Sequence, residues 1–407
     1  MKINDYRYKA KRMKDGKIVK GMAEGPSKAV VDQFLFENGM RAIEIEPYKS
    51  LLAQLNRITL GKVIKDKDLI FYLKQLSSLL RSGVKLNEAC EILATQQTNK
   101  NIRRILYGLY YEVNGGQLFS EALKEYPKDF PKLLVAMIAV GEKTGDLEEV
   151  LTEVADYYEK QFRLRASIKG TMMMPAIYMI VAIGVATFLM VGVLPQFEGM
   201  YDSLGGELPG VTVLFMNIGK FLRANILYLL AGLIIFIILI KQIYKRSYNF
   251  QYAMSVLAIK APIFGSLTIL SNLSRIASTL AQLMKNHVPL QDSLKTTYDT
   301  LDNKVYRKLL VEAQKNVNGG DLMSAAFEHH YASEVVFVRM MSVGERTGDL
   351  GKMMLGLAQF YDEDSDIKVE RLKKALEPLL LIFIYIMIVI MILAVMLPSL
   401  SLSEQLG

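Results

Sequence analysis

Three long stretches without Asp, Glu, Lys, Arg or His interrupt a chain in which apolar positions otherwise recur at helical spacing. The first lies between Gly170 and Phe197, the second covers residues 224–240, and the third covers residues 378–398. A helix crosses about 30 Å of hydrocarbon in roughly 20 apolar residues, and about 17 is the lower limit. The pattern therefore predicts three transmembrane helices, at 171–194, 224–243 and 377–397.

The rest of the chain shows the period of amphipathic helices. Apolar residues recur three and four positions apart from Leu69 to Leu80, and again from Leu273 to Met284. Asn114-Gly115-Gly116 is a helix stop signal, and strand alternation is absent from both regions. Each region is predicted to be an all-α bundle.

The two regions are copies of each other. GEKTGDL at 141–147 returns as GERTGDL at 344–350, and the two motifs lie 203 positions apart. Before the motif the offset is 204, which aligns residues 73–89 with 277–293. Each repeat runs from a helical region into its own apolar span, and its length indicates a duplicated domain rather than a solenoid.

The first 47 residues have a different pattern. Two strand-like segments flank Asp15-Gly16 as a hairpin, Ser27 to Asn38 predicts a helix closed by Gly39, and AIEIE predicts a third strand. A ββαβ unit is expected.

The fold class is thus an all-α membrane protein with two duplicated cytoplasmic six-helix bundles, three transmembrane helices and a small N-terminal α+β domain. Its predicted segments are 1–47 (N-terminal domain), 48–65 (linker), 66–170 (first bundle), 171–194 (first span), 195–223 (extracytoplasmic loop), 224–243 (second span), 244–269 (connector), 270–376 (second bundle), 377–397 (third span) and 398–407 (extracytoplasmic tail).

Charge decides the orientation of the spans. The net charge is +8, and the basic residues gather before the first span, after the second and before the third. Cytoplasmic flanks carry the excess of Lys and Arg, so the N-terminus is expected in the cytoplasm and the C-terminus outside. The same placement explains the charge without nucleic-acid binding. A single cysteine excludes an internal disulfide and a multi-cysteine metal site.

The repeated motif reads as a helix, a break and a second helix. Gly141 is expected to take the left-handed conformation that closes the first helix, and Asp146 to cap the next, with Glu149 completing a capping box. The predicted turn residues are Gly141, Gly145, Asp146, Gly344, Gly348 and Asp349.

Capping does not explain the remaining polar residues of the motif. Either they hydrogen-bond within the turn, which is the favoured interpretation because turn side chains usually satisfy local backbone, or they contact a partner. The partner-contact candidates are Glu142, Lys143, Thr144, Glu345, Arg346 and Thr347. The motif lacks the Gly-Lys-Ser/Thr ending of a phosphate loop, so ATP binding by this chain is not expected.

The helical pattern continues from each motif into a span without a stop signal. Pro175 and Pro378 are expected to kink the two helices near the membrane surface. We hypothesise that each long helix transmits force or rotation from its bundle to the bilayer.

These paired motifs, each followed by a basic flank, a proline and an apolar span, resemble the type II secretion F family over nearly the whole chain. The doubled SGVKL/NHVPL segment supports the resemblance, although His287 stands where the first copy has Gly83, so the second turn is expected to differ. The resemblance implies a non-enzymatic, multi-pass inner-membrane platform that couples a cytoplasmic hexameric assembly ATPase to movement of pilins or pseudopilins into a filament. It also implies contacts with other inner-membrane assembly proteins and membrane lipid. A three-span protomer cannot enclose a filament base, so a homo-oligomer is expected, with Gly184, Gly192 and Gly232 as candidate close-packing points.

Other chemistry finds little support in the residues. Cys90 aligns with Leu294, which predicts an apolar core position, and His287, His329 and His330 form no zinc pattern. The acidic run from Asp362 to Asp366 is typical of a solvated helix face. No catalytic residue, metal or cofactor is expected. A transporter and a static signalling scaffold remain alternatives, although the spans lack the ionisable groups that usually mark ion paths.

Overall fold

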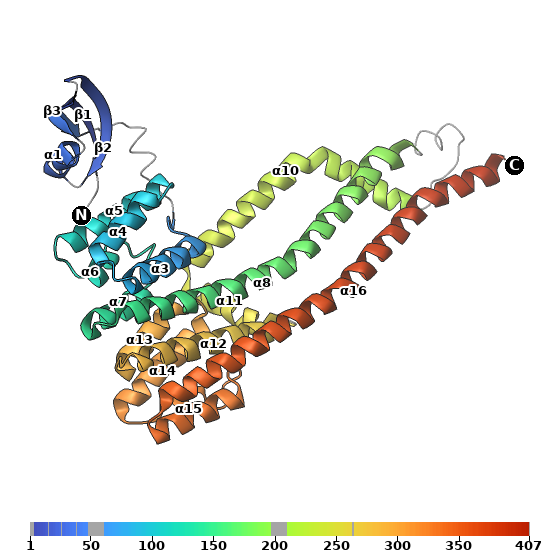
Figure 1. Ribbon diagram of the computed structural model, residues 1–407. Helices are drawn as coiled ribbons and strands as arrows, with labels where there is room; N and C mark the ends of the chain where they lie inside the picture. Colours follow the sequence, from blue (N-terminus) through green and yellow to red (C-terminus); the bar gives the residue numbers. More distant parts are fainter. Residues whose placement is uncertain are drawn as a thin grey trace. The chain divides into compact units, whose positions relative to one another are not determined.

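The computed structural model describes residues 4–14, 16–25, 27–37, 39–47, 61–196, 210–262 and 264–406 (Figure 1). Asp15, most of the predicted linker and residues 197–209 of the predicted extracytoplasmic loop lie outside them. The chain divides into two compact units, described separately below. The first contains residues 1–163, 273–302 and 306–358, and the second contains 164–272, 303–305 and 359–407.

The N-terminal segment forms the predicted ββαβ unit. Its elements are β1 (Asn4–Arg12), β2 (Ile18–Gly25), α1 (Lys28–Glu37) and β3 (Met40–Pro47). The sheet is antiparallel with strand order β2-β1-β3. Tyr6 and Ala10 of β1 pack with Val31 and Leu35 of α1 in a small buried core. Alternation along β1 and the helical spacing on α1 therefore place one apolar face of each element against the other.

The first repeat contains six α-helices. They are α3 (Asp66–Arg81), α4 (Leu86–Gln96), α5 (Lys100–Asn114), α6 (Phe119–Lys124), α7 (Lys132–Thr144) and α8 (Leu147–Phe188). The apolar stripe that the sequence predicts on α3 is buried, including Leu69, Leu73 and Leu76. Gly116 follows α5 with φ of 88°, as its stop signal predicts.

The second repeat has the same element order with one difference. It contains α12 (Phe264–Lys285), α13 (Leu290–Thr300), α14 (Lys304–Gly319), η2 (Met323–Phe327), α15 (Val335–Thr347) and α16 (Leu350–Leu406). The counterpart of α6 is the 3₁₀ segment η2. The repeats therefore share a helical order, but the second does not consist of six α-helices.

The turn after α12 corrects one expectation. His287 was expected to change the turn, yet it adopts φ of 59° where Gly83 has 83°. The same backbone hydrogen bond closes both turns, from Val84 N–H to Leu79 O (3.1 Å) and from Val288 N–H to Leu283 O (2.9 Å). The left-handed region is unfavourable for residues with a Cβ, although histidine is among those found there more often. The surrounding fold thus imposes the glycine conformation on histidine.

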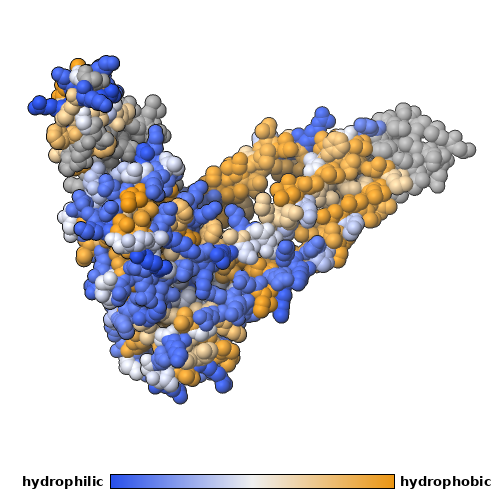
Figure 2. All heavy atoms as spheres, in the orientation of Figure 1, coloured by the Kyte–Doolittle hydropathy of each residue, from blue (hydrophilic) through white to orange (hydrophobic). Residues whose placement is uncertain are grey.

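Within the part of the chain that the structure describes, three helices are long and apolar enough to cross a membrane. They are α8, continued by the π-helical turn η1 (Leu189–Val193), α10 (Gly210–Arg246) and α16. Figure 2 shows hydrophobic residues gathered along them. A further pair, α11 (Tyr248–Lys260) and α12, passes the same test only as one span bent by 109°. Composition and length therefore agree with the three predicted spans.

The helix boundaries differ from the predicted segments. Helix α10 starts at Gly210, so residues 210–223 of the predicted loop are helical. The predicted connector 244–269 contains α11 and the start of α12. Helix α16 runs through Pro378 and on to Leu406, so the predicted tail is helical as well.

Within the second unit, two small apolar clusters join the long helices. Leu267, Val369 and Leu372 form one of them. Leu194, Met216 and Ala394 form the other, and Thr212 Oγ1 donates to Ala394 O at 3.0 Å beside it. A Cβ on Gly219 would lie 2.6 Å from Met190 O, so this glycine allows the two backbones to approach. The candidates Gly184 and Gly232 have no such neighbour within the described residues, and Gly192 meets only Phe188.

Substitution of His287 by valine is expected to lower the free energy of unfolding by about 1–2 kcal/mol, because a β-branched residue tolerates a positive φ poorly. His287→Asn is the matched control, since asparagine adopts this conformation readily. The His287 side chain is exposed, so neither change removes packing. The measurement is the apparent melting temperature of the full chain in detergent. Equal melting of the two variants would contradict the expectation.

Candidate functional site

The motif residues form the junction between a short helix and a long one in each repeat. Helix α7 ends at Thr144, Gly145 follows with φ of 84°, and α8 starts at Leu147. In the second copy α15 ends at Thr347, and Gly348 has φ of 78° before α16 begins. The left-handed C-cap residue is therefore the second glycine of each motif. The expectation that Gly141 takes this conformation is wrong.

Gly141 and its counterpart Gly344 are buried inside helices and serve packing. A Cβ on Gly141 would lie 3.1 Å from Leu147 Cα and 3.2 Å from Val150 Cβ. A Cβ on Gly344 would lie 2.9 Å from Leu350 Cα. A missing side chain therefore lets each short helix lie directly against the first turn of the long helix that follows it.

The predicted capping box is not formed. Asp146 directly precedes α8, and its backbone carbonyl accepts from Val150 N–H at 3.2 Å. Among the hydrogen bonds of the described residues, none is accepted by the Asp146 carboxylate. Glu149 is paired with Lys285 instead, at 3.4 Å. A carboxylate at this position still favours the helix N-terminus electrostatically.

The two threonines bond within their own helix ends. Thr144 Oγ1 donates to Val140 O at 3.2 Å, and Thr347 Oγ1 donates to Val343 O at 2.9 Å. Asp146 N–H in turn donates to Thr144 Oγ1 at 3.4 Å. The hydrogen bonds of these two threonines are therefore local.

The two glutamates reach out of the turn to another element of their repeat. Glu142 accepts from the backbone N–H groups of Phe119 (2.5 Å) and Ser120 (3.2 Å), at the start of α6. Glu345 accepts from Met323 N–H, and from Ser324 N–H at 3.0 Å, at the start of η2. One carboxylate thus bonds two of the unpaired N–H groups that open a helix.

Sequence reasoning did not find this contact, but a signal for it was present. The N-cap positions of α6 and η2 are Leu118 and Leu322, which have no side-chain acceptor. A helix start without a capping residue indicates that its N–H groups find an acceptor elsewhere. Glu142 lies 23 residues after Phe119 and Glu345 lies 22 residues after Met323, and this similar spacing is the remaining clue.

The basic residue of each motif faces solvent. Lys143 and Arg346 are exposed, as are Asp146 and Asp349. The carboxylates of Glu142 and Glu345 are engaged with backbone. In each motif the basic side chain, Lys143 or Arg346, is therefore more available to a partner in solvent than the glutamate before it.

The remaining candidates from the sequence are the single cysteine and the potential metal ligands. Cys90 is buried, lies 4.0 Å from the Tyr72 hydroxyl, and burial raises the pKa of its thiol to about 12. Its counterpart Leu294 is also buried, so the predicted core role is confirmed. No group of three or more potential metal ligands occurs among the described residues, the Asp362–Asp366 run included.

Comparison with known proteins adds the family. The family model described as "Type II secretion system (T2SS), protein F" matches residues 72–195 and again 276–398. The chain belongs to the type II secretion system protein F family. The two matched ranges start at α3 and α12 and end with the first and third apolar helices, as the repeat alignment predicts.

Family members with established names match almost the full chain. The type IV pilus assembly protein PilC of Thermus thermophilus is 32% identical over 381 residues, which is 93% of each chain. The PilC protein of Pseudomonas aeruginosa is 28% identical over 90% of this chain and 98% of its own. The type II secretion system protein F of Vibrio cholerae is 27% identical over 98% of each chain.

We call the two hydrogen bonds that Glu142 or Glu345 accepts from a helix start the helix clamp. Removal of this clamp should destabilise each repeat. Glu142→Ala leaves two N–H groups of α6 without their acceptor, so a loss of about 1–2 kcal/mol in the free energy of unfolding is expected. Glu345→Ala should cost a similar amount, and the double variant should show the sum because the sites share no partner. Lys143→Ala is the control and should be neutral. Urea unfolding of the full chain in detergent measures the change, and a neutral Glu142→Ala would contradict the clamp.

Proposed function

We propose that this family member is an inner-membrane platform protein of a type IV pilus or type II secretion assembly machine. The names of its relatives support this role, since type IV pilus assembly proteins and type II secretion proteins both match nearly the full chain. Three long apolar helices support a membrane location. In this role the chain is non-enzymatic, and its work is to transmit motion supplied by a partner.

The observation that carries the mechanism is helix continuity. Helix α8 runs from the motif at Leu147 to Phe188 and passes Pro175 without ending, and α16 runs from Leu350 through Pro378. An unbroken helix resists compression and bending over several turns, because each backbone hydrogen bond joins adjacent turns. We propose that input from a cytoplasmic hexameric ATPase at the bundles travels along these helices and moves pilins or pseudopilins into the filament. The kinks at Pro175 and Pro378 remain predictions.

The exposed cations are the contact points we propose for that partner. Lys143 and Arg346 occupy equivalent exposed positions in the last turn of α7 and of α15, directly before the two long helices begin. The glutamates of the motif are engaged in the helix clamps, which favours the cations over Glu142 and Glu345 as contacts. A complementary partner surface would be acidic.

Charge placement supports the orientation. The basic flanks of the spans favour bundles in the cytoplasm and a C-terminus outside. A homo-oligomer, other inner-membrane assembly proteins and membrane lipid complete the proposed partners.

A helix breaker tests the coupling. Ala166 is exposed on α8 between the bundle and the apolar stretch, and proline there costs about 3 kcal/mol of helix stability. Ala166→Pro should abolish surface filaments or secretion while the amount of protein in the membrane stays normal. Ala166→Ser is the matched control and should retain function. Full activity of the proline variant would contradict transmission through α8.

Deletion of the gene separates the alternatives. Loss of filaments or of secretion, restored by the intact gene, is expected for the platform. Altered solute uptake with normal filaments would favour a transporter, and a change in neither would favour a static scaffold.

A further inference from the structure

The two repeats pack against each other within the first compact unit, through α8 of the first and α12 of the second. Tyr157 Oη and Thr279 Oγ1 lie 3.0 Å apart, and both residues are buried. Next to them, Arg275 Nε donates to Gln161 at 3.3 Å. At the other end Lys285 pairs with Glu149 and with Glu153. Leu283 of α12 even joins the core of the first bundle.

The duplication gives each side of this contact a counterpart elsewhere in the chain. The face of α12 corresponds to a face of α3, which we call the acceptor face. On it Phe71 stands at the position of Arg275, Gln75 at that of Thr279, and Arg81 at that of Lys285. The face of α8 corresponds to a face of α16, which we call the donor face; it contains Lys352 and Phe360 at the positions of Glu149 and Tyr157.

Both counterpart faces are open within the described part of the chain. Phe71 is 62% exposed, whereas Arg275 at the equivalent position is 9% exposed. Phe360 is 49% exposed, whereas Tyr157 is 7% exposed. Each of these two aromatic side chains is thus exposed at a position whose duplicate is buried in the contact between the repeats.

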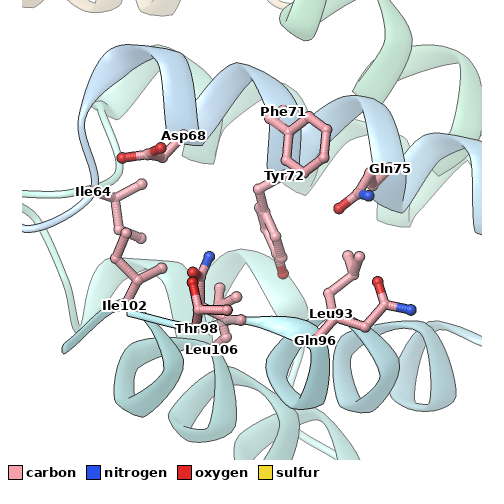
Figure 3. A pocket seen from close by; sticks show the side chains of 11 residues that line it. Ile64, Asp68, Phe71, Tyr72, Gln75, Leu93, Gln96, Thr98, Ile102 and Leu106 are labelled. Atoms are coloured by element: carbon pink, nitrogen blue, oxygen red, sulfur yellow. The ribbon is translucent and has the colours of Figure 1, made fainter. Parts of the chain in front are cut away.

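A pocket beside Phe71 also distinguishes the face of α3 from the face of α12. It has a volume of about 340 Å³, and Phe71, Tyr72, Gln75, Gln96 and Thr98 are among its lining residues (Figure 3). In the second repeat the Arg275 guanidinium fills the equivalent place. Its Nη1 donates to Thr300 O (3.1 Å) and to Asp302 Oδ2 (3.4 Å), the counterparts of Gln96 and Thr98. The hollow on the acceptor face is therefore lined by the counterparts of the residues that bond Arg275 in the second repeat.

The contact between the repeats is not two-fold symmetric. If a two-fold axis related the repeats, α16 would pack on α3 of the same chain whenever α8 packs on α12. The exposure of Phe71 shows that it does not. The contact is heterologous, so it leaves one donor face and one acceptor face unused at opposite ends of the pair.

We propose that these two faces bind each other between copies of the chain. The donor face of one copy docks on the acceptor face of the next, as α8 docks on α12, with Phe360 packed beside Phe71 and Gln75. By the same mapping Lys352 lies beside Arg81, whose charge is already paired with Glu148 at 2.6 Å. A head-to-tail contact of this kind closes into a ring if its rotation allows, and otherwise extends from copy to copy.

A second pair of elements supports the same occupant. Lys132 of α7 pairs with Asp299 of α13 at 2.9 Å, which is a second contact between the repeats. The counterpart of Lys132 is Val335 of α15, which is 69% exposed, and the counterpart of Asp299 is Thr95 of α4, also exposed. An exposed apolar residue thus replaces a paired cation at the place where the next copy would lie.

This interface specifies the homo-oligomer of the proposed function, but its test needs no filament. Cysteine is placed at the exposed positions Arg81 and Lys352, and membranes are treated with a short bis-maleimide. Co-expression of an Arg81→Cys chain with a Lys352→Cys chain should yield a crosslinked dimer, and the double variant should yield a ladder. Neither single variant should crosslink to itself. Native Cys90 is buried and its pKa is raised to about 12, so the unmodified chain should give no crosslinked product.

The chain offers an internal control of matched geometry. Glu149→Cys with Lys285→Cys places the pair at the equivalent positions of the contact between repeats, and it should crosslink within one chain. Phe71→Ser in the double variant should lower the yield of the ladder about tenfold, because the lost apolar contact is worth roughly 1–2 kcal/mol. Val311→Ser, an exposed apolar position on α14, should not change it.

Three outcomes would overturn the proposal. They are a double variant that crosslinks only within its own chain, single variants that crosslink to themselves, and a ladder that Phe71→Ser leaves intact. A normal ladder in cells that lack filaments would support the interface and contradict the platform role instead.

Discussion

The close approach of a short helix to the first turn of a long helix is the constraint on which each repeat depends. Gly141 and Gly344 allow this approach, and Gly145 and Gly348 reverse the chain in the left-handed conformation between the two helices. The direction in which α8 and α16 leave their bundles follows from this junction. The glutamate next to each buried glycine then ties the junction to a third element through two backbone N–H groups. Seven residues therefore position three helices, which explains why the chain contains them twice.

Duplication with divergence explains much of the remainder. The backbone of the two copies is alike even where the residues are not, as the positive φ of Gly83 and His287 shows. The side chains have diverged where the copies have different neighbours. Arg275 is buried and bonded at the contact between repeats, whereas Phe71 at the same place faces outward. A duplicated domain thus acquires an interface with itself and retains a free version of each half of that interface.

The chain belongs to the type II secretion system protein F family, and in the function we propose its long helices conduct motion. Within a repeat the clamp and the glycine junction resist separation of the short helices from the long one. The long helices then continue without a break into apolar segments. The function we propose depends on stiffness and connection rather than on a reactive group.

The sequence alone determined the duplication, the three apolar spans, the ββαβ unit and the helical nature of both bundles, because each depends on periodicity, composition or turn residues within a short window. It also predicted Cys90 as a core residue. It did not determine which glycine of the motif takes the left-handed conformation, since both choices satisfy the local pattern and only packing against Val150 decides. The partners of Glu142 and Glu345 lie more than twenty residues away, and those of Arg275 lie partly in the other repeat. Contacts over such separations arise from the way helices pack, and the tertiary structure alone decided them.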